Sequence, residues 1–199
     1  AMTTDQVTAA IREVADAVRD ASAEQKTITV QGSRTGISAG AVPDGGVIIS
    51  LSKMGAIFGP VAGENTAFTL RVQPGATLAS VRRYLATAPA VAAPLFFPPD
   101  PTETSASLGG MAACNSSGAC SFAYGATRNH IEALCVVLAD GDILDLRRGR
   151  EKADDLRFSL TTAGGRCLAG KLPPLRMPAV KSAAGYWIAP GMDLLDLFI

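Results

Sequence analysis

The sequence of 199 residues has no long uninterrupted apolar run, no excess of charge of one sign and only 1 histidine. No apolar stretch approaches the roughly 20 residues that a membrane-spanning helix needs, and the N-terminus lacks the basic and apolar segments of a secretory signal. The 18 basic side chains balance 18 acidic ones, whereas binding to nucleic-acid phosphates needs a basic excess. We therefore expect a cytoplasmic protein with no transmembrane segment and no nucleic-acid partner.

Signals for metal binding and for disulfides are also missing. The cysteines at positions 114, 120, 135 and 167 show no Cys-x-x-Cys spacing and do not suggest a secreted scaffold, so we expect reduced thiols and no metal site. His130 precedes an apolar run typical of a strand. We interpret it as a turn or surface residue rather than a catalytic one.

What the sequence does contain is the mixture of helix and strand patterns typical of an α+β protein. With 48% hydrophobic residues, 20 glycines and 12 prolines, the chain suits a compact domain with many turns. Apolar residues at spacings of three and four predict helices at about 4–22 and 77–87. Apolar β-branched or alternating runs predict strands at 26–31, 47–51, 67–72, 132–138 and 143–146, the last two forming a hairpin.

The remaining segments have no regular periodicity. The proline-rich stretch 94–101 cannot be a regular helix or central strand and predicts a shaped loop. The mixed-sign charge run 147–157 predicts an exposed loop, and the tail 172–190 predicts a segment lying over the body of the protein. The apolar pattern of 193–199 stops abruptly, which favours a chain truncated at its C-terminal edge.

A loop rich in glycine and hydroxyl residues, 32–40, follows the first predicted strand. Its backbone N–H groups and hydroxyls are able to converge on an anion such as a pyrophosphate, although an ordinary tight loop has a similar composition. No Gly-Lys-Ser/Thr follows, so the loop is not a P-loop. The absence of Gly-x-Gly-x-x-Gly disfavours NAD.

The segment 98–118 is the most unusual part of the sequence, because it is rich in serine, alanine and glycine and almost free of charge. Small side chains let a backbone approach a planar ligand, while serine, threonine and asparagine bond its polar edges. A buried helix N-terminus with hydroxyl caps is the alternative interpretation.

Three blocks occur in order: V-Q-G-S-R-T-G-I-S-A-G-A-V-P, then F-P-P-D-P-T-E-T-S-A-S-L-G-G-M-A-A-C-N-S-S-G, then Y-G-A-T-R, followed by an A-D-G-D hairpin. Together they resemble the FAD-binding domain of the vanillyl-alcohol oxidase and p-cresol methylhydroxylase (PCMH) superfamily, most of all its glycolate oxidase and D-lactate dehydrogenase branch. The resemblance covers nearly the whole chain. It implies an α+β, PCMH-type FAD-binding domain over residues 2–199, with FAD between two α+β subdomains at about 2–74 and 75–199, and with the cap domain absent.

The resemblance also implies which residues contact FAD. The first loop would hold the pyrophosphate through Gly32, Ser33, Arg34, Thr35, Gly36 and Ser38. The ribityl and flavin region would lie against Pro99, Asp100 and Thr102. The cofactor slot would be lined by Ala106, Ser107, Gly109, Gly110, Asn115, Ser117 and Gly118, and it would be closed by Tyr124 and Gly125.

The first loop departs from the family's usual G-x-G-T-G pattern, because Arg34 stands at a glycine position and Ala39 replaces a second glycine. A positive φ at position 34 would strain an arginine, whereas a guanidinium near the phosphates would assist binding. We expect the loop to accommodate Arg34. Some relatives attach FAD through a histidine or cysteine. Since His130 lies outside the first loop and Cys114 and Cys120 have the character of small core thiols, we expect noncovalent FAD.

In this family a 2-hydroxy acid loses a hydride to flavin N5, and electrons pass on to a quinone, an iron–sulfur subunit or oxygen. The substrate-binding and base residues of the family lie mainly in the cap domain, so no catalytic residue is assigned in this chain. The resemblance therefore implies the FAD-binding part of a glycolate- or D-lactate-oxidising enzyme, inactive by itself. Two alternatives remain: a noncatalytic subunit or binding module that keeps the fold, and a phosphate-ligand enzyme of unrelated fold.

Overall fold

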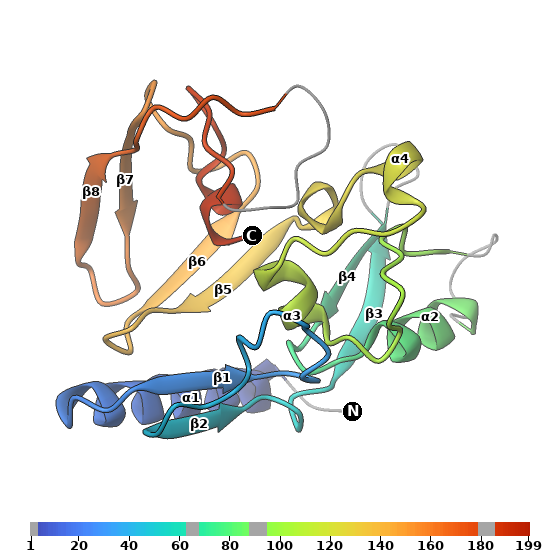
Figure 1. Ribbon diagram of the computed structural model, residues 1–199, viewed down its shortest axis with the longest axis horizontal. Helices are drawn as coiled ribbons and strands as arrows, with labels where there is room; N and C mark the ends of the chain where they lie inside the picture. Colours follow the sequence, from blue (N-terminus) through green and yellow to red (C-terminus); the bar gives the residue numbers. More distant parts are fainter. Residues whose placement is uncertain (1–3, 63–67, 88–94, 179–185) are drawn as a thin grey trace.

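The computed structural model describes residues 4–62, 68–87, 95–178 and 186–199, which form helices and small sheets mixed along the chain (Figure 1). The helices are α1 (Thr4–Ala23), α2 (Leu78–Ala86), α3 (Leu108–Ala113) and α4 (Ser121–Tyr124), with 3-10 turns η1 (Thr127–His130) and η2 (Leu194–Phe198). The strands are β1 (Ile28–Gln31), β2 (Val47–Ser50), β3 (Ile57–Ala62), β4 (Phe68–Val72), β5 (Ala133–Val137), β6 (Ile143–Arg147), β7 (Arg157–Thr161) and β8 (Cys167–Lys171).

The N-terminal part pairs a long amphipathic helix with two short strands. The apolar stripe of α1 is buried at Val7, Ala15 and Val18, as its spacing predicts. Strands β1 and β2 run parallel, with Val30 opposite Ile49, and in Figure 1 α1 lies alongside them. The parallel pairing makes the chain cross from the end of β1 back to the start of β2, and the glycine-rich loop is the first part of that crossing.

The second part consists of the antiparallel pair β3–β4 and helix α2. Helix α2 begins after Thr77, whose side-chain oxygen accepts a hydrogen bond from the Ser80 N–H at 3.1 Å, a regular N-cap. Its apolar face is buried through Leu78 and Val81, which pack in one cluster with Met111 of α3. Helix α3, which carries part of the predicted cofactor slot, is therefore fixed to α2 by a shared core.

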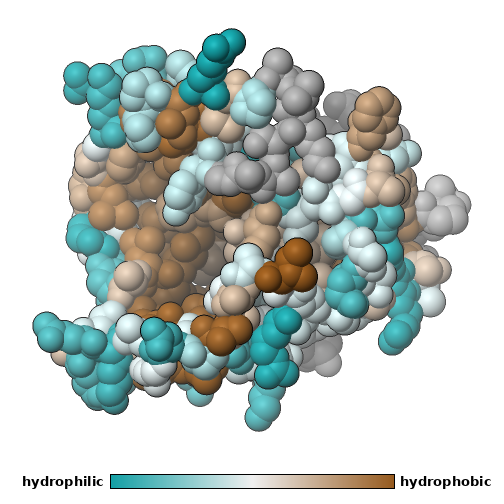
Figure 2. Space-filling view, viewed as in Figure 1, coloured by the Kyte–Doolittle hydropathy of each residue, from teal (hydrophilic) through white to brown (hydrophobic). Residues whose placement is uncertain are grey.

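The third part holds the hairpin β5–β6, the antiparallel pair β7–β8 and the C-terminal η2. Leu144 and Leu146 of β6 form a second core cluster with Leu194 and Leu195 of η2, all at most 2% exposed. On the face drawn in Figure 2, apolar side chains gather in a hollowed area over the region of β5 and β6. The C-terminal residues are thus part of the core of this region rather than a tail.

The secondary structure agrees with most of the sequence-based expectations. The predicted helices and strands appear as α1, α2, β1, β2, β4, β5 and β6, and the described part of the proline-rich loop, 95–101, has no regular structure. Strands β3, β7 and β8 were not predicted, and β7 begins where the charge run ends. Of the predicted covering tail, 179–185 lies outside the described residues, while Leu172 and Ile188 are buried.

Candidate functional site

The glycine-rich loop meets the serine- and glycine-rich segment at Ser107. The Ser33 N–H donates to the Ser107 hydroxyl at 3.3 Å, although the two residues are 74 positions apart. A Cβ added at Gly32 would lie 2.1 Å from the same hydroxyl oxygen, so only glycine fits there without movement. Ser107 is 3% exposed. Two of the sequence blocks that predict the cofactor slot are therefore in direct contact.

The middle of this loop presents backbone donors without a protein acceptor. Among the described residues, no acceptor is found for the N–H groups of Arg34, Thr35 and Gly36. Arg34 has φ +59° and Ala39 has φ +61°, so the two departures from the family's glycine pattern both occupy left-handed backbone. That conformation costs about 1 kcal/mol or more for a residue with a Cβ. The strain expected at Arg34 is thus present, and the loop accommodates it.

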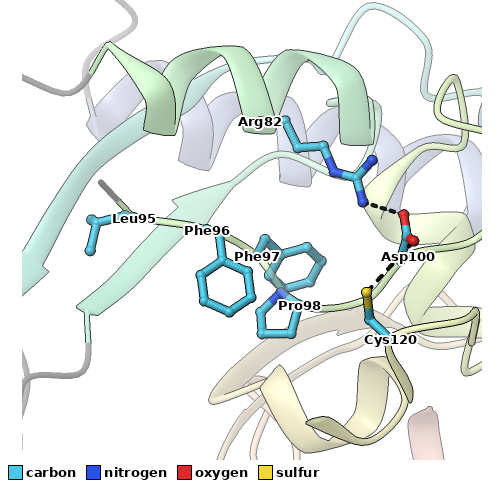
Figure 3. Close-up of a pocket in the computed structure, with 7 residues that line it drawn as sticks. All are labelled: Arg82, Leu95, Phe96, Phe97, Pro98, Asp100 and Cys120. Carbon is cyan, nitrogen blue, oxygen red and sulfur yellow. Dashed lines mark hydrogen bonds and ion pairs between the residues drawn. The ribbon is translucent and has the colours of Figure 1, made fainter. Parts of the chain in front are cut away.

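The loop 98–101, also predicted to contact the cofactor, is packed closely against Gly118. A Cβ added at Gly118 would lie 1.5 Å from the carbonyl oxygen of Asp100, a distance that no side chain tolerates. The Asp100 carboxylate accepts a hydrogen bond from Nη2 of Arg82 at 2.6 Å and faces the Cys120 thiol at 3.7 Å (Figure 3). The hydrogen bond from Arg82 holds the pKa of Asp100 below its usual value. Asp100 is therefore a fixed carboxylate within the predicted site.

A cavity of about 270 Å³ lies beside this ion pair. Its polar end is formed by Arg82, Asp100 and Cys120, and Figure 3 shows the rings of Phe96, Phe97 and Pro98 along the apolar side. Ligand pockets for whole cofactors span several hundred cubic ångströms or more. The cavity is therefore large enough for only part of a dinucleotide.

The last part of the predicted slot is organised around Asn115. This residue is 4% exposed, has φ +42° and accepts a hydrogen bond from the Arg128 N–H through Oδ1 at 2.9 Å. Asparagine tolerates the left-handed region better than other residues with a Cβ. Tyr124 makes an edge-to-face contact with Phe96, with ring centroids 5.4 Å apart. Gly125 has φ +85° and lies against Asn129.

The structure brings some of the predicted residues together and leaves others apart. Contacts join Gly32 and Ser33 to Ser107, and Asp100 to Gly118. Gly109 packs on Pro74, where an added Cβ would lie 2.6 Å from the proline ring. Ser38 and Thr102 are exposed and have no hydrogen-bond partner among the described residues.

Sequence reasoning did not identify Arg82 and Asp196. Arg82 is one of two adjacent arginines on a helix, a pattern that carries no signal for a distant carboxylate. Asp196 lies in η2 and contacts both Arg128, at 3.9 Å from Nε, and Arg148, at 3.0 Å from Nη2. Arg128 also stacks over the Trp187 ring at 5.7 Å. This second charged cluster lies next to the Tyr124–Arg128 block.

Other chemistry is sparse in the part of the chain that the structure describes. It holds no group of three or more histidine, cysteine or acidic side chains arranged for a metal ion. None of its helices is long and apolar enough to cross a membrane. The ring Nε2 of His130 lies 2.9 Å from the carbonyl oxygen of Tyr124, a residue predicted to close the cofactor slot.

Known proteins share sequence with a large part of this chain. A family model described as FAD binding domain matches residues 7–147. The D-lactate dehydrogenase of Anaerostipes hadrus is 37% identical over 135 residues, which are 67% of this chain and 27% of that protein. The glycolate oxidase subunit GlcD of Bacillus subtilis is 36% identical over 132 residues, 65% of this chain and 26% of that protein. The chain thus spans about a quarter of the length of these relatives.

Solved structures share the fold at lower identity. Chitooligosaccharide oxidase superposes with a TM-score of 0.57 at 24% identity, over 69% of this chain and 28% of that one. The 6-hydroxy-D-nicotine oxidase of Arthrobacter nicotinovorans gives the same TM-score of 0.57 at 19% identity, over 70% of this chain and 29% of that one. The predicted α+β, PCMH-type fold is confirmed.

Proposed function

Because the chain belongs to the FAD binding domain family and its cofactor is FAD, we propose that it is the FAD-binding part of a flavin-dependent oxidoreductase that oxidises a 2-hydroxy acid. The names of the relatives, a D-lactate dehydrogenase and a glycolate oxidase subunit, support this substrate class. The observation that carries the proposal is the contact of the glycine-rich loop with Ser107, which brings together two distant blocks of the proposed FAD site.

The residues present fit a flavin dinucleotide. Three consecutive N–H groups, those of Arg34, Thr35 and Gly36, have no acceptor among the described residues and suit a pyrophosphate. An added Cβ at Gly32 or Gly118 would collide with Ser107 or with the Asp100 carbonyl, so these glycines allow the close packing of the segments that the proposal places around the cofactor. In the proposal, these residues hold the cofactor without a covalent bond.

In the proposal, FAD carries out the redox chemistry and the residues of this chain bind and orient it. Bound FAD supplies the acceptor for the two electrons of the oxidation. The loop at 32–38 would bind the phosphates, the loop 98–101 and residues 106–118 would line the ribityl and ring portions, and Tyr124 with Gly125 would close the slot. The boundary between two subdomains near residue 74 and the cytoplasmic location belong to the same proposal. No residue of the chain is assigned as the base.

Cofactor retention tests the FAD part of the proposal. The purified chain is mixed with FAD and desalted, and the visible flavin absorbance and the quenching of flavin fluorescence are measured. We expect flavin to remain bound in a one-to-one ratio and to be displaced by excess fresh FAD, because the proposed attachment is noncovalent. Loss of all flavin on desalting, with the chain folded by circular dichroism, would contradict FAD binding by this chain and favour a noncatalytic module.

The substrate class is tested with the whole flavoprotein to which we assign the chain. Under anaerobic conditions, D-lactate or glycolate should bleach the visible flavin absorbance, whereas the corresponding acids without the 2-hydroxyl group should not. Bleaching by alcohols that lack the carboxylate, but not by 2-hydroxy acids, would overturn the substrate assignment and leave FAD binding intact.

A further inference from the structure

Arg82 lies outside every motif that predicts the cofactor site, yet its guanidinium reaches into it. The side chain extends from α2 to the loop 98–101, where Nη2 lies 2.6 Å from Oδ1 of Asp100 (Figure 3). The other carboxylate oxygen of Asp100 faces the Cys120 thiol at 3.7 Å. Asp100 is thus held between a residue of α2 and a residue just after Gly118.

The helix that carries Arg82 is fixed to the cofactor segment by backbone hydrogen bonds. The Leu78 N–H donates to the Ala106 carbonyl and the Ala79 N–H to the Thr104 carbonyl, both at 2.9 Å. Ser107 continues this contact as an isolated bridge partner of Thr77. Arg82 therefore projects from a rigid base whose position relative to the slot is set independently of Asp100.

The loop that Arg82 reaches has little regular structure to hold it. Residues 95–101 are neither helix nor strand, and three of the four residues 98–101 are prolines, which have no N–H to donate. Its position is nevertheless closely constrained, because the Asp100 carbonyl fills the place that a side chain at Gly118 would take. Buried Pro99 and the packing of Phe97 against the core cluster of α2 and α3 hold the middle of the loop, and the hydrogen bond from Arg82 is the contact that orients the Asp100 carboxylate.

We propose that Arg82 is a positioning residue, which holds Asp100 and with it the loop 98–101 against Gly118, so that this wall of the FAD site is formed before the cofactor binds. The inference rests on the proposed function, since it assigns this loop to FAD. The ion pair itself is more than one third exposed on both sides, with side-chain exposures of 38% and 35%. Pairs of this exposure add little to stability, so the role of Arg82 is separable from folding.

The experiment compares Arg82→Met with Arg83→Met in the complete chain, with FAD affinity measured by fluorescence quenching. Arg83 is the next residue of α2, is exposed, and has no ion-pair partner among the described residues. We expect Arg82→Met to weaken FAD binding about threefold to fivefold, because an exposed ion pair contributes at most about this factor to keeping the wall formed. Arg83→Met should stay within about twofold, and Arg82→Lys should recover part of the loss because it keeps the charge but not the forked geometry.

A double-mutant cycle shows whether Arg82 acts through Asp100. If it does, the Arg82→Met substitution has no further effect on FAD affinity once Asp100→Asn is present. Equal affinity of Arg82→Met and the unchanged chain overturns the proposal, and so do losses that add in the double variant. If Arg82→Met does not fold, the same double-mutant cycle of FAD affinity with Arg82→Lys and Asp100→Asn tests whether Arg82 acts through Asp100.

A readout without cofactor separates this inference from the proposed function. The carboxyl carbon of Asp100 is titrated by NMR in the unchanged apo chain and in the Arg82→Met variant, with Arg83→Met as the control. We expect the pKa of Asp100 to rise toward its usual value in Arg82→Met alone, since the hydrogen bond from Arg82 is what lowers it. If the pKa of Asp100 is the same in Arg82→Met as in the unchanged chain, Arg82 does not position Asp100, even if FAD binds. If the pKa of Asp100 rises in Arg82→Met but the chain does not bind FAD, only the proposed function is rejected.

Discussion

Two arginine–carboxylate centres flank the candidate site, and they differ in burial. The pair Arg82–Asp100 is more than one third exposed on both sides and borders the cavity. The cluster of Arg128, Arg148 and Asp196 is mostly buried, with side-chain exposures of 12%, 27% and 12%. Burial lowers the pKa of Arg128. Burial also opposes the charge of Arg148, but the hydrogen bond to Asp196 and the charges of Asp196, Asp193 and Glu132 together outweigh it and raise the pKa of Arg148.

The difference in burial indicates that one arginine–carboxylate centre stabilises the fold and that the other shapes a ligand site. A buried carboxylate that neutralises two guanidinium groups cannot be removed without leaving charge out of water, so Asp196 serves the fold. An exposed pair is weakened by water and its partners remain accessible, so Arg82–Asp100 is suited to shaping a ligand site. The cluster of Asp196 also joins η2 to residues on both sides of position 147, where the family match ends.

The largest effect is expected for Asp196→Asn, which removes the single carboxylate of the buried cluster. Arg128 would lose its carboxylate partner, and Arg148 would keep only the charges of Asp193 and Glu132. The Nε atom of Arg128 is already buried without a hydrogen bond among the described residues. We expect the free energy of unfolding to fall by about 3–5 kcal/mol, measured by urea denaturation.

The matched control is Asp16→Asn, which breaks the exposed ion pair with Arg19 on α1. This substitution should change the free energy of unfolding by less than about 0.5 kcal/mol. Equal losses of unfolding free energy in Asp196→Asn and Asp16→Asn would show that burial does not determine how much an ion pair contributes to stability here.

The next effect is expected for Gly118→Ala, which acts at the wall that Asp100 forms. The added Cβ would meet the Asp100 carbonyl oxygen at 1.5 Å, so the loop 98–101 must move away. We expect FAD affinity to fall by more than about 10-fold and stability to fall by about 1–3 kcal/mol, the usual range for overpacking.

Gly55→Ala is the control for this substitution, because no atom lies within 4 Å of the added Cβ and the position is outside the slot. Its FAD affinity should match that of the unchanged chain. If Gly118→Ala binds FAD as well as the unchanged chain, the loop 98–101 is not a wall of the site. The contrast would then support only the structural role of the buried Asp196 cluster.

A smaller effect is expected for the thermal stability of Arg82→Met and its dependence on pH. The Arg82 hydrogen bond lowers the pKa of Asp100 in the folded chain, so the stabilisation exists above the unfolded pKa and disappears as the pH falls through the folded one. At neutral pH we expect the Tm to change by less than about 3 °C. The difference from the unchanged chain should vanish as the pH falls below about 4. Melting curves over a pH series would refute this if the difference grows on acidification.

The sequence predicted those helices and strands that depend on neighbouring residues, such as an apolar spacing, a helix cap or a turn. Helix α2 follows from its apolar spacing and the Thr77 cap, and the β5–β6 hairpin from two apolar strands around Asp-Gly. Strand β3 was missed because it contains Gly59 and Pro60, which read as a turn, and its pairing with β4 shifts register there. Strand β7 was missed because it begins with Arg157 at the end of a charge run.

The candidate site divides in the same way. The glycine-rich loop and the segment 98–118 stand out by their composition, but their assignment to FAD came from the resemblance of three ordered blocks to a known family. Arg82 and Asp100 are 18 residues apart, and Arg148 and Asp196 are 48 apart, so only the folded chain reveals that they meet. Charged partners far apart in sequence leave no periodic signal, and a single arginine on a helix is indistinguishable from a solvated one.

The smallest effect is expected at Arg34, where the sequence left open whether the arginine is only accommodated or also contributes. The φ of +59° shows that Arg34 occupies the strained left-handed conformation. Asparagine tolerates that conformation well, so Arg34→Asn removes the charge and keeps the backbone conformation. We expect stability to change by less than about 0.5 kcal/mol, because the side chain is exposed. FAD affinity should fall about threefold at low salt and less at high salt, since the interaction of an exposed guanidinium with phosphate is screened. An affinity that does not depend on residue 34 at any salt concentration would mean that backbone N–H groups such as those of Arg34, Thr35 and Gly36, which have no acceptor among the described residues, hold the pyrophosphate without the guanidinium.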